Sequence, residues 1–220
     1  MFEISLDAPK TGRCVIEGAT APHESNKVLF ALHGYGQLPA FFVRHFAPVV
    51  AAGWTVVAPE GLHRFYVSGT SGRVGASWMT KEARETDIED TLKWLERVRQ
   101  EVLGHHRPKE LVLLGFSQGV AAAMRWAALR GHAGTWDRLV FWAGVLPPDL
   151  PWTEEGLSAL RNTPIDTALG DDDPFFDAKL ADDSRHLLTQ AGLEPVHHSF
   201  HGGHRINGEL LATILDSPRL

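Results

Sequence analysis

Hydrophobic and polar positions along the chain follow two alternating patterns, and their order predicts the fold. Short apolar runs, typical of buried strands, are interleaved with longer stretches in which apolar residues recur at helical spacing. We expect strands at residues 13–18, 27–32, 54–58, 111–114, 137–143, 163–169 and 196–200. We expect helices at residues 39–52, 82–103, 120–129, 174–191 and 207–215, with residues 60–80 as a long irregular connection rich in glycine and serine.

Strands that alternate with helices predict an α/β fold, in which helices cover both faces of a mostly parallel central sheet. The 220 residues fit a single domain of this class, residues 1–220, because a chain of this length can bury one sizeable core. The connection between the strands expected at 137–143 and 163–169 is short, so we expect no separate lid domain. In such sheets, active sites lie at the carboxyl ends of the strands.

Composition narrows the classes of partner. A net charge of −6 argues against nucleic acid as a partner, because binding to phosphates needs a clustered basic surface. No apolar stretch reaches the roughly 18 residues that would favour a membrane span, and the first ten residues lack the pattern of a signal peptide. Cys14 is the single cysteine, which favours a buried thiol and a cytoplasmic location. Composition does not define the oligomeric state.

The segment that reads as strand, turn and helix near residue 117 carries the motif Gly115-Phe116-Ser117-Gln118-Gly119. In this context Gly-x-Ser-x-Gly is typical of a nucleophile elbow, a strained turn that exposes a serine hydroxyl above a parallel sheet. The two glycines allow the helix to begin very close to the strand. We therefore predict that Ser117 is a nucleophile.

A serine hydroxyl needs a neighbouring base to take its proton and an acid to orient that base. In this architecture they follow in the order serine, acid, histidine, each after a strand. We expect Asp173 to be the acid, because Pro174 suits the first turn of a helix that Asp173 would cap; capping alone is the alternative role. We expect His204 to be the base because two glycines before it permit a sharp turn, with His201 as the alternative.

The oxyanion formed during acyl transfer needs preorganised N–H donors, each contributing about 3 kcal/mol to stabilisation of the transition state. The N–H of Gln118 is one candidate, because it follows the nucleophile at the start of a helix. The N–H of Tyr35 is the other, because Gly34 and Gly36 let the backbone approach a substrate closely. An ordinary glycine turn is the alternative for this loop. The histidine spacings do not match zinc motifs, so we expect neither a metal nor a cofactor.

Several of these motifs together resemble the phospholipase/carboxylesterase family of α/β-hydrolases, which includes acyl-protein thioesterases and bacterial carboxylesterases. The matching residues are Leu32-His33-Gly34-Tyr35-Gly36, Gly115-Phe116-Ser117-Gln118-Gly119, Gly170 with Asp173-Pro174, Gly203-His204 and the segment Ser77-Trp78. The resemblance extends over residues 27–205 and implies an α/β-hydrolase fold. It also implies a triad of Ser117, Asp173 and His204, with Tyr35 and Gln118 as the oxyanion hole. Phe175-Phe176 and residues 60–75 depart from the family pattern.

The function expected from these residues is that of a serine carboxylesterase or thioesterase. It would hydrolyse a small-molecule acyl ester or thioester through an acyl-enzyme, without a cofactor. We expect an apolar substrate pocket, although aromatic residues near strand ends are often plain core; its candidate residues are Trp78, Trp142, Leu146, Phe175 and Phe176. Two alternatives remain: a catalytically silent binding protein of the same fold, and an acyltransferase or peptidase that uses the same triad.

Overall fold

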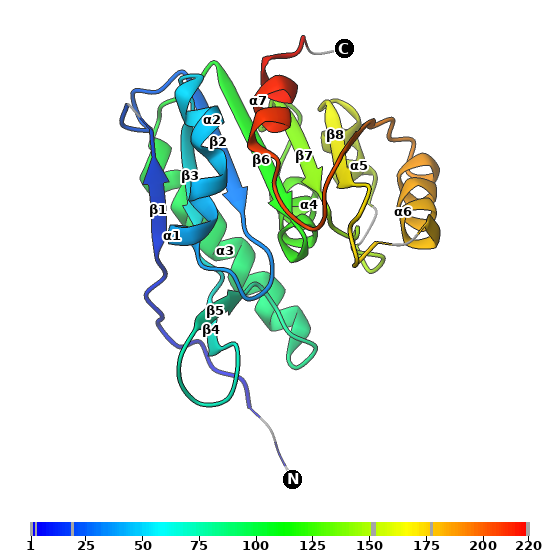
Figure 1. Cartoon of the computed structure of the whole chain (residues 1–220). Coiled ribbons are helices and arrows are strands. Elements are labelled where there is room, and N and C mark those ends of the chain that lie inside the picture. The colour runs from blue at the N-terminus through cyan, green and yellow to red at the C-terminus, as the bar shows by residue number, and fades with distance from the viewer. Residues whose placement is uncertain (1, 3, 19, 151–152, 177, 219–220) are drawn as a thin grey trace.

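The structure, a computed structural model, describes residues 2, 4–18, 20–150, 153–176 and 178–218. Its central sheet has seven strands in the order β1-β3-β2-β6-β7-β8-β9 (Figure 1). Only the β1–β3 pair of this sheet is antiparallel, which confirms the mostly parallel α/β fold. The strands are β1 (Cys14–Glu17), β2 (Lys27–Leu32), β3 (Thr55–Pro59), β6 (Glu110–Phe116), β7 (Arg138–Trp142), β8 (Ile165–Gly170) and β9 (Val196–Phe200).

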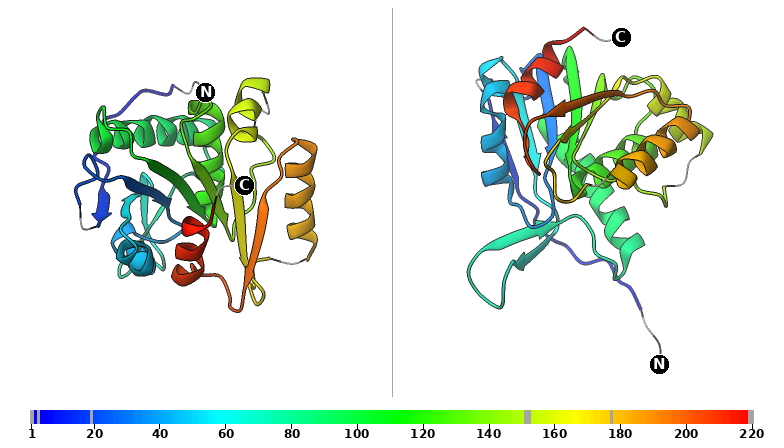
Figure 2. Two further views of the ribbon diagram at one scale, coloured as in Figure 1. Left: turned by 90° about the horizontal axis from the view of Figure 1, so that it is seen from above. Right: turned by 45° about the vertical axis from the view of Figure 1, so that its right-hand side comes forward.

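Helices cover both faces of this sheet, as the view from above in Figure 2 shows. One face carries α3 (Arg84–Leu103), α4 (Gln118–Arg130), α5 (Glu154–Arg161) and α6 (Ala178–Gln190). The other carries α1 (Pro39–Phe42), the 3-10 helix η1 (Val43–Phe46), α2 (Ala47–Ala51) and α7 (Gly208–Asp216). Each face has its own apolar core.

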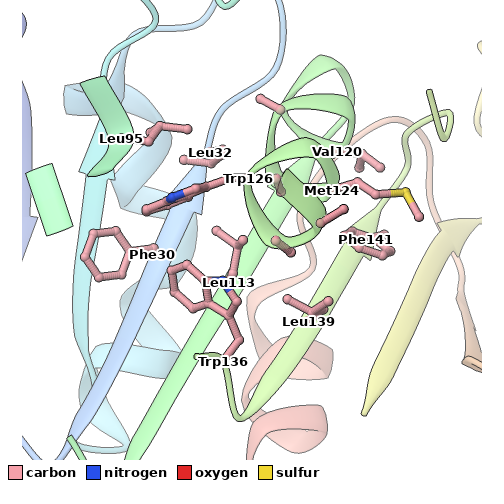
Figure 3. Packing of buried hydrophobic residues seen from close by; sticks show 14 of the residues in the cluster. Phe30, Leu32, Leu95, Leu113, Val120, Met124, Trp126, Trp136, Leu139 and Phe141 are labelled. Atoms are coloured by element: carbon pink, nitrogen blue, oxygen red, sulfur yellow. The ribbon is translucent and has the colours of Figure 1, made fainter. Parts of the chain in front are cut away.

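The larger core lies between the sheet and the face formed by α3 and α4. Phe30, Leu113 and Trp126 are buried there, and the rings of Trp126 and Trp136 meet edge to face with centroids 4.8 Å apart (Figure 3). Burying one large apolar side chain stabilises the fold by about 2–3 kcal/mol, so this core holds α4 firmly against β6. This packing fixes the position of Ser117, the residue between β6 and α4.

Besides the helix expected at 174–191, which begins later, the structure corrects the expected elements at three places. The helix expected at 39–52 is broken into α1, η1 and α2, because Pro48 lacks an N–H and its ring crowds the preceding turn. The expected irregular connection at 60–80 contains an antiparallel hairpin of β4 (His63–Tyr66) and β5 (Val74–Ser77) (Figure 1). Helix α5 was not expected, although the Thr153 side chain caps it by accepting the Gly156 N–H.

Among the described residues, no helix combines the length and apolar character needed to cross a membrane.

Candidate active site

Ser117 lies in the tight turn between β6 and α4, at the carboxyl edge of the sheet. Its backbone has φ +53° and ψ −119°, a region that residues with a Cβ rarely occupy. The Ser117 N–H donates to the Trp142 carbonyl at 2.9 Å, and the Val120 N–H donates to the Ser117 carbonyl at 3.0 Å. Packing and these bonds hold the strained turn in place, as at many functional sites.

The turn depends on Gly119, because the first turn of α4 passes directly over the end of β2. A Cβ at this position would collide with the backbone oxygen of Leu32. We expect Gly119→Ala to lower the free energy of unfolding by about 3 kcal/mol, as overpacking does in a closely packed core. Urea denaturation measures this loss.

Gly203→Ala is the matched control for Gly119→Ala, since a Cβ there meets only the Asp172 carbonyl oxygen at 3.5 Å, an ordinary contact. Equal stability losses in the two variants would contradict the argument from close approach at Gly119.

Asp173 and His204 come together because β8 and β9 are parallel neighbours, with Gly170 opposite Phe200 at their carboxyl ends. The loops that follow the two strands therefore lie side by side. His204 Nδ1 is 2.7 Å from Asp173 Oδ2. The Asp173 side chain is fully buried, and that of His204 is 18 % exposed. A carboxylate at Nδ1 fixes the imidazole with Nε2 free to accept a proton.

The reason given for choosing Asp173 was wrong. Helix α6 begins at Ala178 instead of Pro174, and residue 177 of the expected helix lies outside the described residues. Asp173 therefore does not cap α6; its Oδ1 accepts the Phe175 N–H at 2.9 Å within the loop. Together with His204, this bond orients both carboxylate oxygens.

The alternative base, His201, lies at the surface. Its side chain is 90 % exposed, and Nδ1 is 3.2 Å from Asp171 Oδ2. The hydrogen bond that His201 donates to the exposed Asp171 carboxylate raises the pKa of His201. Asp171, Asp172 and His201 are the one group of three or more His, Cys, Asp or Glu among the described residues whose possible ligand atoms lie within 4.8 Å of one another, and all three are exposed.

Ser117 and His204 line one cavity of about 420 Å³, a size within the range of small-molecule sites. The rings of Phe116 and Phe175 flank the His204 imidazole, with centroids at 4.9 and 4.7 Å. The hydrogen bonds of the described residues do not include one between Ser117 Oγ and His204, and such bonds often form only with substrate bound. The other lining residues are Tyr35, Gln118, Ala121, Ala143, Gly144, Val145, Phe175 and Phe176.

Both expected oxyanion donors lie at this cavity. Gln118 is the first residue of α4, and the first N–H groups of a helix have no acceptor within it. Its side chain is locked, since Oε1 accepts the Trp78 N–H at 3.1 Å and Nε2 donates to the Met79 carbonyl at 3.0 Å. The N–H of Tyr35 has no acceptor among the described hydrogen bonds, whereas the N–H of Gly36 donates to the Ala76 carbonyl.

His33 supports the loop that carries Tyr35. It is completely buried; its Nε2 accepts the Gly61 N–H at 3.0 Å, which makes Nδ1 the donor to the Gly34 carbonyl at 2.8 Å. Burial lowers the pKa of His33 to about 4, so the ring is neutral at pH 7. Through these bonds His33 connects the loop after β2 to the chain after β3.

The low pKa of His33 makes stability depend on pH. Because the value falls from 6.5 to about 4 on folding, the unfolded chain binds more protons between these pH values. The stabilisation is complete above pH 6.5 and is lost as the pH falls toward 4. When the pH is lowered from 7 to 5, we expect the free energy of unfolding of His33→Gln to fall by about 2 kcal/mol less than that of the wild type. Urea denaturation at the two pH values measures this difference. Parallel losses in the two proteins would contradict the buried neutral ring.

The residues expected to form an apolar pocket divide into two groups. Phe175 and Phe176 line the cavity with Ser117, and Leu146 lines two cavities that adjoin it. Trp78 and Trp142 are completely buried in the two cores, where their Nε1–H groups donate to the carbonyls of His33 and Arg205. The sequence analysis missed Val145 and Gly144; their position after β7, at the carboxyl edge of the sheet, was the signal that could have found them.

Comparisons with known proteins show the family to which the chain belongs. The family model described as phospholipase/carboxylesterase matches residues 12–219. A carboxylesterase from Mesorhizobium loti shares 19 % identity with a TM-score of 0.71, covering 97 % of this chain and 99 % of its own. Acyl-protein thioesterase 2 of Zea mays shares 16 % identity with a TM-score of 0.69, covering 93 % and 96 %. No curated protein matches.

The chain has the α/β-hydrolase fold and belongs to the phospholipase/carboxylesterase family. Membership of this family makes it a hydrolase that acts on ester or thioester bonds.

Proposed function

We propose that the chain is a serine carboxylesterase or thioesterase in which Ser117, His204 and Asp173 form the catalytic triad. The observation that carries this proposal is the 2.7 Å contact between His204 and the buried Asp173, at a cavity that Ser117 also lines. The left-handed backbone at Ser117 supports it, because such strain is typical of a nucleophile elbow.

In the proposed reaction, His204 Nε2 takes the Ser117 hydroxyl proton as Oγ bonds to the substrate carbonyl carbon. The carbonyl π electrons move to its oxygen, and the N–H groups of Tyr35 and Gln118 stabilise that oxyanion. As the tetrahedral intermediate collapses, the bond to the leaving oxygen or sulfur breaks and His204 donates the proton to it. Water, deprotonated by His204, then hydrolyses the acyl-enzyme. The mechanism uses no cofactor.

The acyl chain is proposed to occupy a mostly apolar cavity of about 390 Å³ that adjoins the catalytic one between β7, β8, β9 and α6. The two cavities share Ala143, Gly144 and Phe176. Phe141, Leu146 and Leu188 add apolar surface to its wall, which suits a hydrocarbon chain.

The wider organisation expected from the sequence belongs to the same proposal. One domain, residues 1–220, is supported by the single sheet that runs from β1 to β9. A small-molecule substrate fits the size of the cavities. A cytoplasmic location is supported by the single cysteine, Cys14, which has no second cysteine in the chain with which to form a disulfide.

The proposal is tested by a fluorophosphonate probe followed by peptide mapping, together with a series of 4-nitrophenyl esters of increasing chain length. We expect one labelled residue, Ser117, and hydrolysis of the esters, with thioesters and amides as comparison substrates. Folded protein that neither takes up the probe nor hydrolyses any ester would contradict the proposal.

A further inference from the structure

A further cavity adjoins the proposed catalytic one and shares Leu146 with the apolar cavity. Its volume is about 370 Å³, and it shares Gln118, Ala121 and Val145 with the catalytic cavity. It lies between the start of α3 and the connection that follows β7. The remaining lining residues are Met79, Thr80, Lys81, Arg84, Leu146, Pro147 and Pro148.

The charged residues that line this cavity are both cations, Lys81 and Arg84. Arg84 donates from Nε and Nη2 to Asp149 Oδ2 at 3.0 and 2.8 Å. Arg125, 2 % exposed on α4, donates from Nη2 to the other oxygen of the same carboxylate at 2.5 Å. Two guanidinium groups thus share one acid, which is itself not among the lining residues, and positive charge is left in excess.

The pKa shift of Arg125 agrees with this excess of positive charge. Burial lowers the pKa of Arg125; the Asp149 carboxylate raises it, and the charge of Arg84 lowers it again, so the two guanidinium groups repel each other. Lys81 is exposed and has no ion pair among the described residues. An ammonium and a guanidinium beside an apolar wall of proline and leucine favour an anionic group of modest size.

We infer that this further cavity, hereafter the cationic subsite, binds a carboxylate or phosphate carried by the substrate. The inference rests on the proposed function and names its substrate class: an ester or thioester with an anionic group a short distance from the scissile bond. The anion stands on the leaving-group side when the acyl chain occupies the apolar cavity, or on the acyl side when a short acyl chain extends into the subsite instead, because both cavities adjoin the catalytic one.

The test compares matched pairs of substrates. On the acyl side, 4-nitrophenyl hydrogen glutarate is compared with 4-nitrophenyl pentanoate; on the leaving-group side, 3-butanoyloxypropanoate is compared with propyl butanoate. We expect the wild type to prefer the anionic member of at least one pair in kcat/KM. Arg84→Gln should reduce that preference about tenfold and Lys81→Gln less, since a charge-assisted hydrogen bond is lost.

Three further measurements test whether the preference for the anionic substrate depends on the charges of the cationic subsite. Arg97→Gln, the same change of charge at an exposed position of α3, should leave the preference unchanged. Arg84→Lys should restore part of the preference lost in Arg84→Gln, because it returns the charge without the fork of donors. Added salt should weaken the preference in the wild type.

Equal rates for both members of both pairs would overturn the inference. So would a preference that survives in both Arg84→Gln and Lys81→Gln, or one that falls equally in Arg97→Gln. Calorimetric titration of the Ser117→Ala protein with monoethyl glutarate, against ethyl pentanoate, separates this result from failure of the proposed function. Binding that depends on Arg84, in a protein whose wild type hydrolyses no ester, would reject the esterase proposal and retain the subsite.

Discussion

Replacing Ser117 with alanine is expected to reduce kcat for 4-nitrophenyl esters by roughly 10⁴- to 10⁶-fold, because the variant has no oxygen to form the acyl-enzyme. The small activity that remains would come from the oxyanion donors and from substrate binding. The fold should be retained, since alanine keeps the Cβ that the left-handed turn already accommodates. Initial rates measure the loss of kcat, and active-site titration with the phosphonate probe measures the loss of labelling.

Ser71→Ala is the matched control, because Ser71 is an exposed serine in the loop between β4 and β5. It should keep wild-type rates and labelling. If Ser117→Ala retained more than a few per cent of the wild-type rate at unchanged stability, another nucleophile would have to be sought. The probe would then label a residue other than Ser117, which peptide mapping would identify.

The centre of the sheet could be predicted from the sequence because β2, β3, β6 and β7 are buried at nearly every position. Runs such as Leu111 to Leu114 are apolar at every position, which distinguishes them from loops and from the amphipathic α3. The β4–β5 hairpin lacked such a signal. Its burial alternates along His63–Tyr66, its sequence is rich in glycine, and it is held partly by the ring of Phe65, which stacks on Tyr35 from a distant loop. A contact between residues so far apart in the sequence leaves no local pattern of apolar and polar positions that could predict it.

The candidate site could be predicted in outline for a geometric reason. Parallel strands deliver the residues that follow them to one edge of the sheet, so Ser117 after β6, Asp173 after β8 and His204 after β9 had to lie near one another. The burial of the individual side chains could not be predicted in the same way. Trp78 follows a strand as Phe175 does, yet it is completely buried while Phe175 is 69 % exposed.

Asp173→Asn is expected to lower kcat by roughly 10⁴-fold while leaving the fold intact. The amide can still accept the Phe175 N–H through its oxygen, but its NH₂ group cannot accept a proton from His204 Nδ1. The imidazole would then be held in the tautomer with the proton on Nε2, which cannot act as the base toward Ser117. Raising the pH would not restore the rate, because the charge of the carboxylate is lost at every pH.

Asp171→Asn provides a control two residues away in the same loop. Asp171 has its own partners, the exposed His201 and the N–H of Gly202, and neither Asp171 nor His201 lines the cavity of Ser117. The substitution should leave kcat within about twofold, since exposed ion pairs contribute little. His204→Ala and His201→Ala form the corresponding pair on the base side. If Asp171→Asn and His201→Ala caused the large losses instead, the outer pair would be the catalytic one, and the buried contact between Asp173 and His204 would be structural.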